Sequence, residues 1–195
     1  MKASAQRLLA LAAVLALAGC ASAPKMTGNA CAIFDQRSGF VSDWRGDAER
    51  ASAEFGVPVH VLMATIQAES NFDGRARPPR RWILGFIPGK RISTAYGYAQ
   101  VLDGTWDEYQ RRTGRHGDRR NDFADAVRFI GWYHADTSRR LGIAKSDAYN
   151  LYLAYHSGHA GYERGVWRNR PEALRGAKRA RDMAARYAAQ LQRCS

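Results

Sequence analysis

The spacing of apolar residues limits the folds open to this chain more than any other feature. Six segments place apolar residues on one face at helical intervals, and they cover residues 43–55, 58–70, 103–113, 122–142, 146–158 and 169–191. No run of alternating apolar and polar residues competes with them. With 195 residues, the chain is long enough for one domain with a sizeable core. The sequence therefore predicts an all-α fold in a single domain.

Capping residues set the expected ends of the longer helices. Asp122 is a good N-cap for the longest helix, and Gly142 follows it as a stop. Ser146 is expected to cap the next helix, which ends at Gly158. Pro58 suits a first helical position.

One segment, RARPPRRWILGFIPGKRIST at residues 75–94, breaks the helical pattern. Its three prolines exclude a single helix. Residues 82–87 and 90–94 can form a small β-hairpin turned at Pro88-Gly89. The alternative is an irregular loop packed on the domain.

The first residues have the features of an export signal. Lys2 and Arg7 precede an apolar run at residues 8–18, which is short for a membrane span. The run ends in LAGC, which resembles the lipobox of bacterial lipoproteins, so Cys20 is the expected lipidation site. An ordinary secretory signal, which would leave Cys20 a plain thiol, is the alternative.

These features divide the chain into three parts. Residues 1–19 are the expected signal peptide, residues 20–40 a lipidated N-terminus and tether, and residues 41–195 the folded domain. Ala21 and Ser22 follow the anchor, and neither is the Asp that such lipoproteins tend to use for inner-membrane retention. The resemblance implies a periplasmic protein anchored in the inner leaflet of the outer membrane.

Export to an oxidising compartment would allow the two remaining cysteines to form a disulfide. Cys31 and Cys194 lie near opposite ends of the expected domain, and chain ends are often close together. Because the periplasm is oxidising, we expect a disulfide between them, with two unpaired thiols as the alternative. No Cys-x-x-Cys or paired His spacing indicates zinc, so no metal or other cofactor is expected.

The chain is strongly basic. Its formal net charge is +12, and without Lys2 and Arg7 it is +10. This balance favours anionic partners. An exported protein rarely meets nucleic acid, so peptidoglycan, with its peptide carboxylates, is the expected polyanion. A merely solvated basic surface is the alternative.

Glu69 occupies a position where an apolar residue is expected. Leu62 and Ile66 precede it by seven and three residues, so the three share a helical face. Burial and the C-terminal end of a helix dipole both raise the pKa of a carboxyl group. A protonated carboxyl at neutral pH suits the general acid of a glycosidase. Alternatively, Glu69 leans into solvent or pairs with Arg75 or Arg77.

Three short motifs follow one another on the expected helices. They are Glu69-Ser70, the stretch GYAQ at residues 97–100 and the stretch AYHSG at residues 154–158. In this order they resemble the SLT-type lytic transglycosylases of the lysozyme superfamily. That family has a Glu-Ser pair, a Gly-Leu-Met-Gln stretch and an Ala-Tyr-Asn-x-Gly stretch.

The resemblance implies a lysozyme-like domain with a cleft for glycan strands and no cofactor. It makes Glu69 the single catalytic acid and base, and Tyr155 the tyrosine that reaches toward its carboxyl group. The residues expected to bind substrate are Ser70, Gly97, Tyr98, Gln100, Tyr155 and His156. Gly97 would let the backbone approach a sugar.

The sequence departs from the family pattern in three places. Tyr98-Ala99 replaces Leu-Met, and His156 replaces asparagine. The spacing from Glu69 to Gly97 is also long, because it contains the basic insert. These departures concern substrate details more than the reaction class.

No second carboxylate has a strong claim to catalysis. Asp73, Asp103 and Asp107 are near in sequence, but Asp103 or Asp107 better suits the first turn of its helix. A lone acid fits the transglycosylase reaction, which by resemblance forms a 1,6-anhydro sugar without consuming water. The alternatives are a hydrolytic muramidase and an inactive peptidoglycan-binding scaffold.

The insert has a candidate role of its own. Arg80, Arg81, Lys90 and Arg91 flank apolar residues that a small monomer would not expose without a reason. We expect residues 79–91 to be a flap over the cleft or a hairpin that docks a protein partner. A basic adaptor that binds a membrane or partner through this segment is a further alternative.

Overall fold

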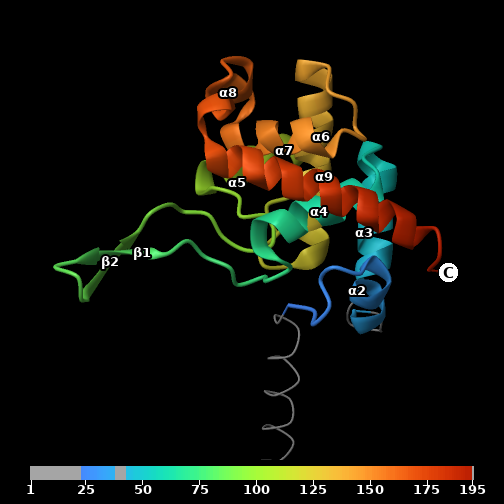
Figure 1. Cartoon of the computed structure of the whole chain (residues 1–195), viewed down its shortest axis with the longest axis horizontal. Coiled ribbons are helices and arrows are strands. Elements are labelled where there is room, and N and C mark those ends of the chain that lie inside the picture. Colours follow the sequence, from blue (N-terminus) through green and yellow to red (C-terminus); the bar gives the residue numbers. More distant parts are fainter. Residues whose placement is uncertain (1–22, 38–42, 195) are drawn as a thin grey trace, which may run out of the picture.

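The computed structural model describes residues 23–37 and 43–194, which are helical apart from one hairpin (Figure 1). The helices are α2 (Ala30–Gln36), α3 (Trp44–Phe55), α4 (Val59–Ser70), α5 (Asp103–Thr113), α6 (Phe123–Leu141), α7 (Ala148–Ser157), α8 (His159–Glu163), the 3₁₀ helix η2 (Val166–Asn169) and α9 (Pro171–Leu191). The strands are β1 (Arg80–Ile83) and β2 (Ile87–Arg91). The predicted all-α class with one small hairpin is confirmed.

The longer helices begin and end where short polar residues and glycines permit. Asp122 caps α6 by accepting a hydrogen bond from the Asp125 amide, and Gly142 ends that helix with φ of 68°. The cap of α7 differs by one residue from the prediction. Asp147, not Ser146, accepts the hydrogen bond from the Asn150 amide.

The long C-terminal helix holds the domain together. α9 packs along α4 and α7, while α3 packs along α6 (Figure 1). Trp44 of α3 stacks on Phe123 of α6 with 4.0 Å between ring centroids, and Phe72 stacks on the same indole. α4 lies in the interior, because α9, α3, α6 and α7 contact it and its residues 61–66 are all buried.

Part of the segment expected to be a tether, residues 20–40, belongs to the folded domain. Residues 30–36 form α2, and Ala30 and Ile33 are buried in the main core. Gln190 of α9 accepts a hydrogen bond from the Ala30 amide, and a disulfide joins Cys31 to Cys194. The composition of this segment is small and polar, but its contacts with α9 make it part of the domain.

The hairpin is the outlier of the fold. β1 and β2 pair antiparallel and extend away from the helices as a long arm (Figure 1). The turn lies at residues 84–86, where Leu84 and Gly85 have positive φ, and not at Pro88-Gly89 as predicted. Pro88 lies inside β2, which is an edge strand and can lack a backbone donor there.

The predicted signal peptide at residues 1–19 and the lipidation site Cys20 lie outside the described residues. Of the helices in the described part, none has the length and apolar character that a bilayer span requires.

Candidate active site

A sharp turn fixes the position of Glu69. The residue lies in the last turn of α4, and Asn71 and Phe72 follow it with φ of 51° and 62°. Two consecutive non-glycine residues in this region are costly and need support from packing. Phe72 is completely buried against Trp44, which holds the turn and directs the carboxyl group of Glu69 outward from the core.

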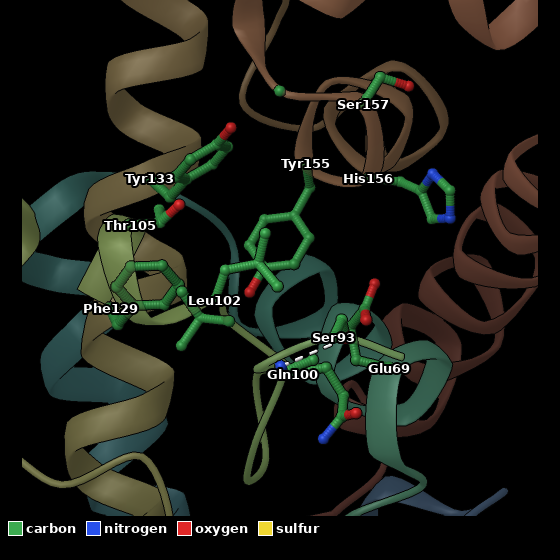
Figure 2. Close-up of a pocket in the computed structure, with 13 residues that line it drawn as sticks. Glu69, Ser93, Gln100, Leu102, Thr105, Phe129, Tyr133, Tyr155, His156 and Ser157 are labelled. Atoms are coloured by element: carbon green, nitrogen blue, oxygen red, sulfur yellow. Dashed lines mark hydrogen bonds between the residues drawn. The ribbon is translucent and has the colours of Figure 1, made fainter. Parts of the chain in front are cut away.

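Glu69 opens into a cleft of about 530 Å³. The walls come from the end of α4, the segment before α5, and helices α5, α6 and α7 (Figure 2). The lining residues are Glu69, Ser93, Ala95, Gln100, Val101, Leu102, Thr105, Phe129, Tyr133, Tyr155, His156, Ser157 and Gly158. Glu69 is the one carboxylate among these described lining residues.

The surroundings of Glu69 favour its protonated form. Burial raises the pKa of Glu69 from 4.5 to about 7, while a hydrogen bond with Tyr152 and the charge of Arg179 oppose that rise. No ion pair found among the described residues joins Glu69 to Arg75 or Arg77. The Cζ atom of Arg77 lies 3.9 Å from the centroid of the Tyr96 ring instead. Near neutral pH, the Glu69 carboxyl group is therefore protonated in a substantial fraction of the molecules.

Tyr152 is the direct partner of Glu69, although the motif comparison does not include it. Its hydroxyl bonds the carboxyl group, and burial together with the Glu69 charge raises the pKa of Tyr152 far above its usual value. Gly176 of α9 makes room for the ring, because a Cβ there would lie 2.4 Å from a Tyr152 ring atom. A glycine on one helix thereby positions a tyrosine on another.

Tyr155 lies beside Glu69 but bonds elsewhere. Its hydroxyl donates to the Ala99 carbonyl at 2.5 Å, not to the carboxyl group as expected. The ring packs edge-on to Tyr133 at 5.1 Å and forms part of the cleft wall (Figure 2). Burial, the nearby Glu69 charge and the neighbouring tyrosines raise the pKa of Tyr155 well above its usual value, so it stays a neutral donor.

Gln100 lies on the cleft wall with its amide nitrogen occupied. That nitrogen donates to the Ala76 carbonyl at 2.9 Å and to the Gly97 carbonyl at 2.8 Å. The remaining polar atom, Oε1, is an acceptor and is the one that can meet a sugar hydroxyl. Gln100 also ties the base of the hairpin arm to the cleft.

Three residues expected to bind substrate occupy other places. Tyr98 is 1% exposed and packs edge-on against the stacked rings of Trp44 and Phe123 in the core. Gly97 has φ of 77°, and a Cβ would lie 2.0 Å from the Arg120 carbonyl oxygen. The glycine is therefore required by the Arg120 backbone rather than by a sugar.

Ser70 is the third of these residues. Its hydroxyl donates to the Ile66 carbonyl, one helical turn back along α4. It is not among the residues that line the cleft.

His156 and Ser157, at the end of α7, line the cleft above Glu69 in the view of Figure 2. Desolvation by surrounding protein lowers the pKa of His156, and Arg170 acts in the same direction against Glu172. His156 is therefore mainly neutral at pH 7. The Ser157 hydroxyl is buried and finds no hydrogen-bond partner within residues 23–37 and 43–194.

Two of the other three acidic residues considered from the sequence have structural partners, and the third is exposed. Asp103 lies in the first turn of α5 and forms an ion pair with Arg120 at 2.7 Å. Asp73 accepts a hydrogen bond from the Arg75 amide. Asp107 is exposed on α5 and does not line the cleft.

The sequence held signals for the residues that motif reasoning missed. Tyr152 precedes Tyr155 by three residues, and Phe129 precedes Tyr133 by four, so each pair shares a helical face. Leu102, Thr105 and the segment from Ser93 to Ala95 had no comparable signal, because tertiary packing brings them to the cleft. No cluster of three or more His, Cys, Asp or Glu side chains within the described ranges is placed to hold a metal ion.

Comparison with known proteins agrees with this arrangement. The model of one protein family, described as "Transglycosylase SLT domain", matches residues 8–194. A search among curated proteins finds no match.

Proposed function

The chain belongs to the transglycosylase SLT domain family, and on that premise we propose that it is a peptidoglycan lytic transglycosylase with Glu69 as its acid and base. The observation that carries the proposal is that Glu69 is the one carboxyl group among the described residues lining the cleft, and that burial raises its pKa to about 7. The bond cleaved is the β-1,4 linkage from N-acetylmuramic acid to N-acetylglucosamine.

The first step is proton transfer to the leaving sugar. Protonated Glu69 gives its proton to the glycosidic oxygen while the bond from that oxygen to C1 of the muramic acid breaks. The N-acetyl group of the same ring assists by donating electrons to C1. Partial burial suits Glu69 to this step, since it keeps the group protonated near neutral pH.

The second step closes a ring. The 6-hydroxyl of the muramic acid attacks C1, and Glu69, now a carboxylate, takes the hydroxyl proton. The hydroxyl is part of the reacting sugar, so its effective concentration is high. The product is a 1,6-anhydro sugar, Glu69 returns to its protonated state, and no water is consumed.

Other cleft residues bind and position the glycan in this proposal. The Oε1 atom of Gln100 accepts from a sugar hydroxyl, because the amide nitrogen is already bonded to the Ala76 and Gly97 carbonyls. Tyr155 and Tyr133 supply flat apolar surfaces against which a pyranose ring can pack. The basic chain adds long-range attraction for the peptide carboxylates of peptidoglycan.

Digestion of purified sacculi tests the reaction. We expect muropeptides lighter by one water than the hydrolytic products, with termini that borohydride does not reduce. Glu69→Gln keeps the shape and removes the acid, so activity should fall by about 10² to 10⁴ or more, while binding to sacculi persists. Glu49→Gln, which removes an exposed carboxyl group of α3 outside the cleft lining, is the control for altered charge.

The two alternatives give different results. A muramidase yields products of full hydrolytic mass with reducible termini. An inactive scaffold yields no soluble muropeptides and no difference between the wild type and Glu69→Gln. Either result removes the transglycosylase assignment.

We also propose that the protein is lipid-anchored through Cys20 at the inner leaflet of the outer membrane. The support is the apolar run and LAGC motif in the sequence. Incorporation of labelled palmitate that disappears in Cys20→Ala tests the anchor, and sucrose-gradient separation of the two membranes tests its place. Labelling that persists in Cys20→Ala would exclude Cys20 as the lipid site.

A further inference from the structure

The β1–β2 arm ends in a tip that is apolar on both faces. Leu84 and Phe86 in the turn are 78% and 71% exposed, and the strand residues beside them are also exposed. In the register, Ile83 pairs with Ile87, and Trp82 pairs with Pro88 on the opposite face. We define residues 82–88 as the hairpin tip.

This distribution does not suit a protein surface. A two-stranded sheet that docks on a protein buries one face and keeps the other polar. In the hairpin tip, no such division exists, because successive residues on both faces are apolar. An environment that is apolar on all sides of the inserted end is a lipid layer.

Polar and apolar residues of the arm are separated along its length: the cations lie behind the apolar tip on both strands. Arg80 and Arg81 precede the tip on β1, and Lys90 and Arg91 follow it on β2. Arg80 pairs directly with Arg91, so cations from both strands lie at one level. Such a ring of cations suits the headgroup level of a membrane, with the apolar end below it.

The surrounding sequence adds charge of one sign only. Residues 74–102 contain six Arg or Lys residues and no Asp or Glu. None of the ion pairs found within the described ranges includes the four cations next to the tip. An anionic partner would meet no repulsion here.

The length of the tip also fits. From the Trp82–Pro88 pair to Gly85 is three residues, or roughly 10 Å at about 3.3 Å per residue. Interfacial segments place their apolar surface about 5–10 Å into the boundary between headgroups and acyl chains.

We propose that the β1–β2 hairpin inserts end-on into an anionic lipid surface, with residues 82–88 among the acyl chains and the four flanking cations at the phosphates. The helices then lie away from that surface, since the arm extends from the helical body (Figure 1). The lipid surface is a second attachment point, separate from any anchor at Cys20.

Vesicle flotation tests the proposal with the chain from residue 21 onward. Every described helix, the hairpin and the disulfide lie in this chain, and it lacks the N-terminal segment that would itself bind lipid. We expect it to float with vesicles of phosphatidylglycerol and phosphatidylcholine and only weakly with phosphatidylcholine alone. Leu84→Glu should weaken binding by about tenfold or more. Met26→Glu, at an exposed apolar residue away from the hairpin, should change it by less than about twofold.

Two double variants that each remove two positive charges distinguish insertion of the hairpin from general attraction between a basic protein and an anionic vesicle. Arg80→Gln with Arg81→Gln should weaken binding to anionic vesicles, whereas Arg175→Gln with Lys178→Gln on α9 should have little effect. An equal loss in both pairs would mean diffuse attraction by a basic protein and would overturn the proposal. Each variant is compared with the wild type by thermal melting, so that a folding defect is seen directly.

Fluorescence locates the tip. Brominated lipids should quench the emission of Trp82, identified as the signal absent in Trp82→Phe. A hairpin that docks on a protein would leave vesicle binding absent or unchanged in Leu84→Glu, and that result overturns the proposal. Glu69→Gln should bind vesicles as the wild type does, so the outcome does not depend on the catalytic proposal.

Discussion

At the scale of residues, the cleft depends on how the charge of Glu69 is balanced. Burial disfavours the carboxylate, while Tyr152 and Arg179 stabilise it, and the result is a pKa of about 7. A general acid with a pKa near the working pH is both protonated and a good proton donor. Tyr152 and Arg179, which limit the rise of the Glu69 pKa, are therefore also expected to affect the rate.

Tyr152→Phe should move the basic limb of the pH profile. The hydroxyl of Tyr152 stabilises the Glu69 carboxylate, so removing it raises the pKa of Glu69 above about 7. The fall in kcat/KM at high pH should then occur at higher pH than in the wild type. The displacement of the basic limb is measured from rates of sacculus digestion over about two pH units on either side of neutral.

The control lies on the same helix. Tyr149→Phe removes a hydroxyl from a residue that does not line the cleft, and its profile should match the wild type. A basic limb displaced to lower pH in Tyr152→Phe would contradict the assigned hydrogen bond.

Glu69→Gln should change stability in a pH-dependent way. The pKa of Glu69 is raised on folding, so its contribution to stability is fully present below 4.5 and is lost as pH rises through about 7. The 2.5-unit difference between these values corresponds to at most about 3 kcal/mol. Relative to the wild type, Glu69→Gln should therefore gain stability between pH 4 and pH 8 (roughly half a unit below the lower pKa and about one unit above the higher one).

Urea unfolding at the two pH values measures this gain. The surface variant Glu49→Gln is the control and should show no comparable dependence. A difference between wild type and Glu69→Gln that stays constant with pH would mean that Glu69 titrates as an ordinary exposed carboxyl group.

At the scale of elements, turns and helix contacts place the site while the hairpin stays outside it. The end of α4, the arm base near Gln100 and the end of α7 meet at the cleft. The hairpin tip does not line it. None of the described residues 79–91, the segment expected to form a flap over the cleft or a docking hairpin, lines the cleft, whereas Ser93 and Ala95 just beyond it do.

Deleting residues 79–91, with a short Gly-Ser link, should leave a folded protein. Most side chains of the segment are exposed, so the deletion removes little buried apolar surface. Arg77 and Tyr96, which contact each other at the arm base, remain. Circular dichroism should show unchanged helix content and a melting temperature within about 5 °C, a shift of roughly 1–2 kcal/mol for a domain of this size.

A collapse of the melting temperature would make the segment part of the core. The control is the Arg77→Ala variant of the full chain, which disturbs the arm base while retaining the tip. It separates loss of the base contact from loss of the hairpin.

At the scale of the whole molecule, the two ends of the domain are joined. Cys31 and Cys194 are bridged across 163 positions, beside the hydrogen bonds of Gln190 to Ala30 and Gly28. Closing a loop this long restricts the unfolded chain strongly. The bridge and α9 together keep α2 within the domain.

Cys31→Ser should lower the free energy of unfolding by up to about 5 kcal/mol, the loop-entropy value for a loop of this length. Chemical denaturation of oxidised protein measures it, and the double variant with Cys194→Ser should lose the same amount. Thiol counting on denatured, unreduced wild type should find neither of these two cysteines free. Equal stability of oxidised wild type and Cys31→Ser would contradict a stabilising bridge.

The sequence by itself determined what depends on local spacing and chemistry. Helical periodicity gave the all-α class, and Asp122 and Gly142 marked the ends of α6 within a residue. The position of Glu69 on an apolar stripe indicated a partly buried carboxyl group before any fold was known. These inferences hold because capping and amphipathicity act between residues a few positions apart.

Only the tertiary structure decided which residues meet at the carboxyl group and which serve the core. Gly97 and Tyr98 belong to a sugar-binding motif by sequence, yet they pack against Arg120 and Trp44. Tyr152 bonds Glu69 from a helix that lies about eighty residues further along the chain, where Gly176 makes room for its ring. Such contacts depend on how helices cross and on volumes shared between distant side chains, and no local pattern encodes either quantity.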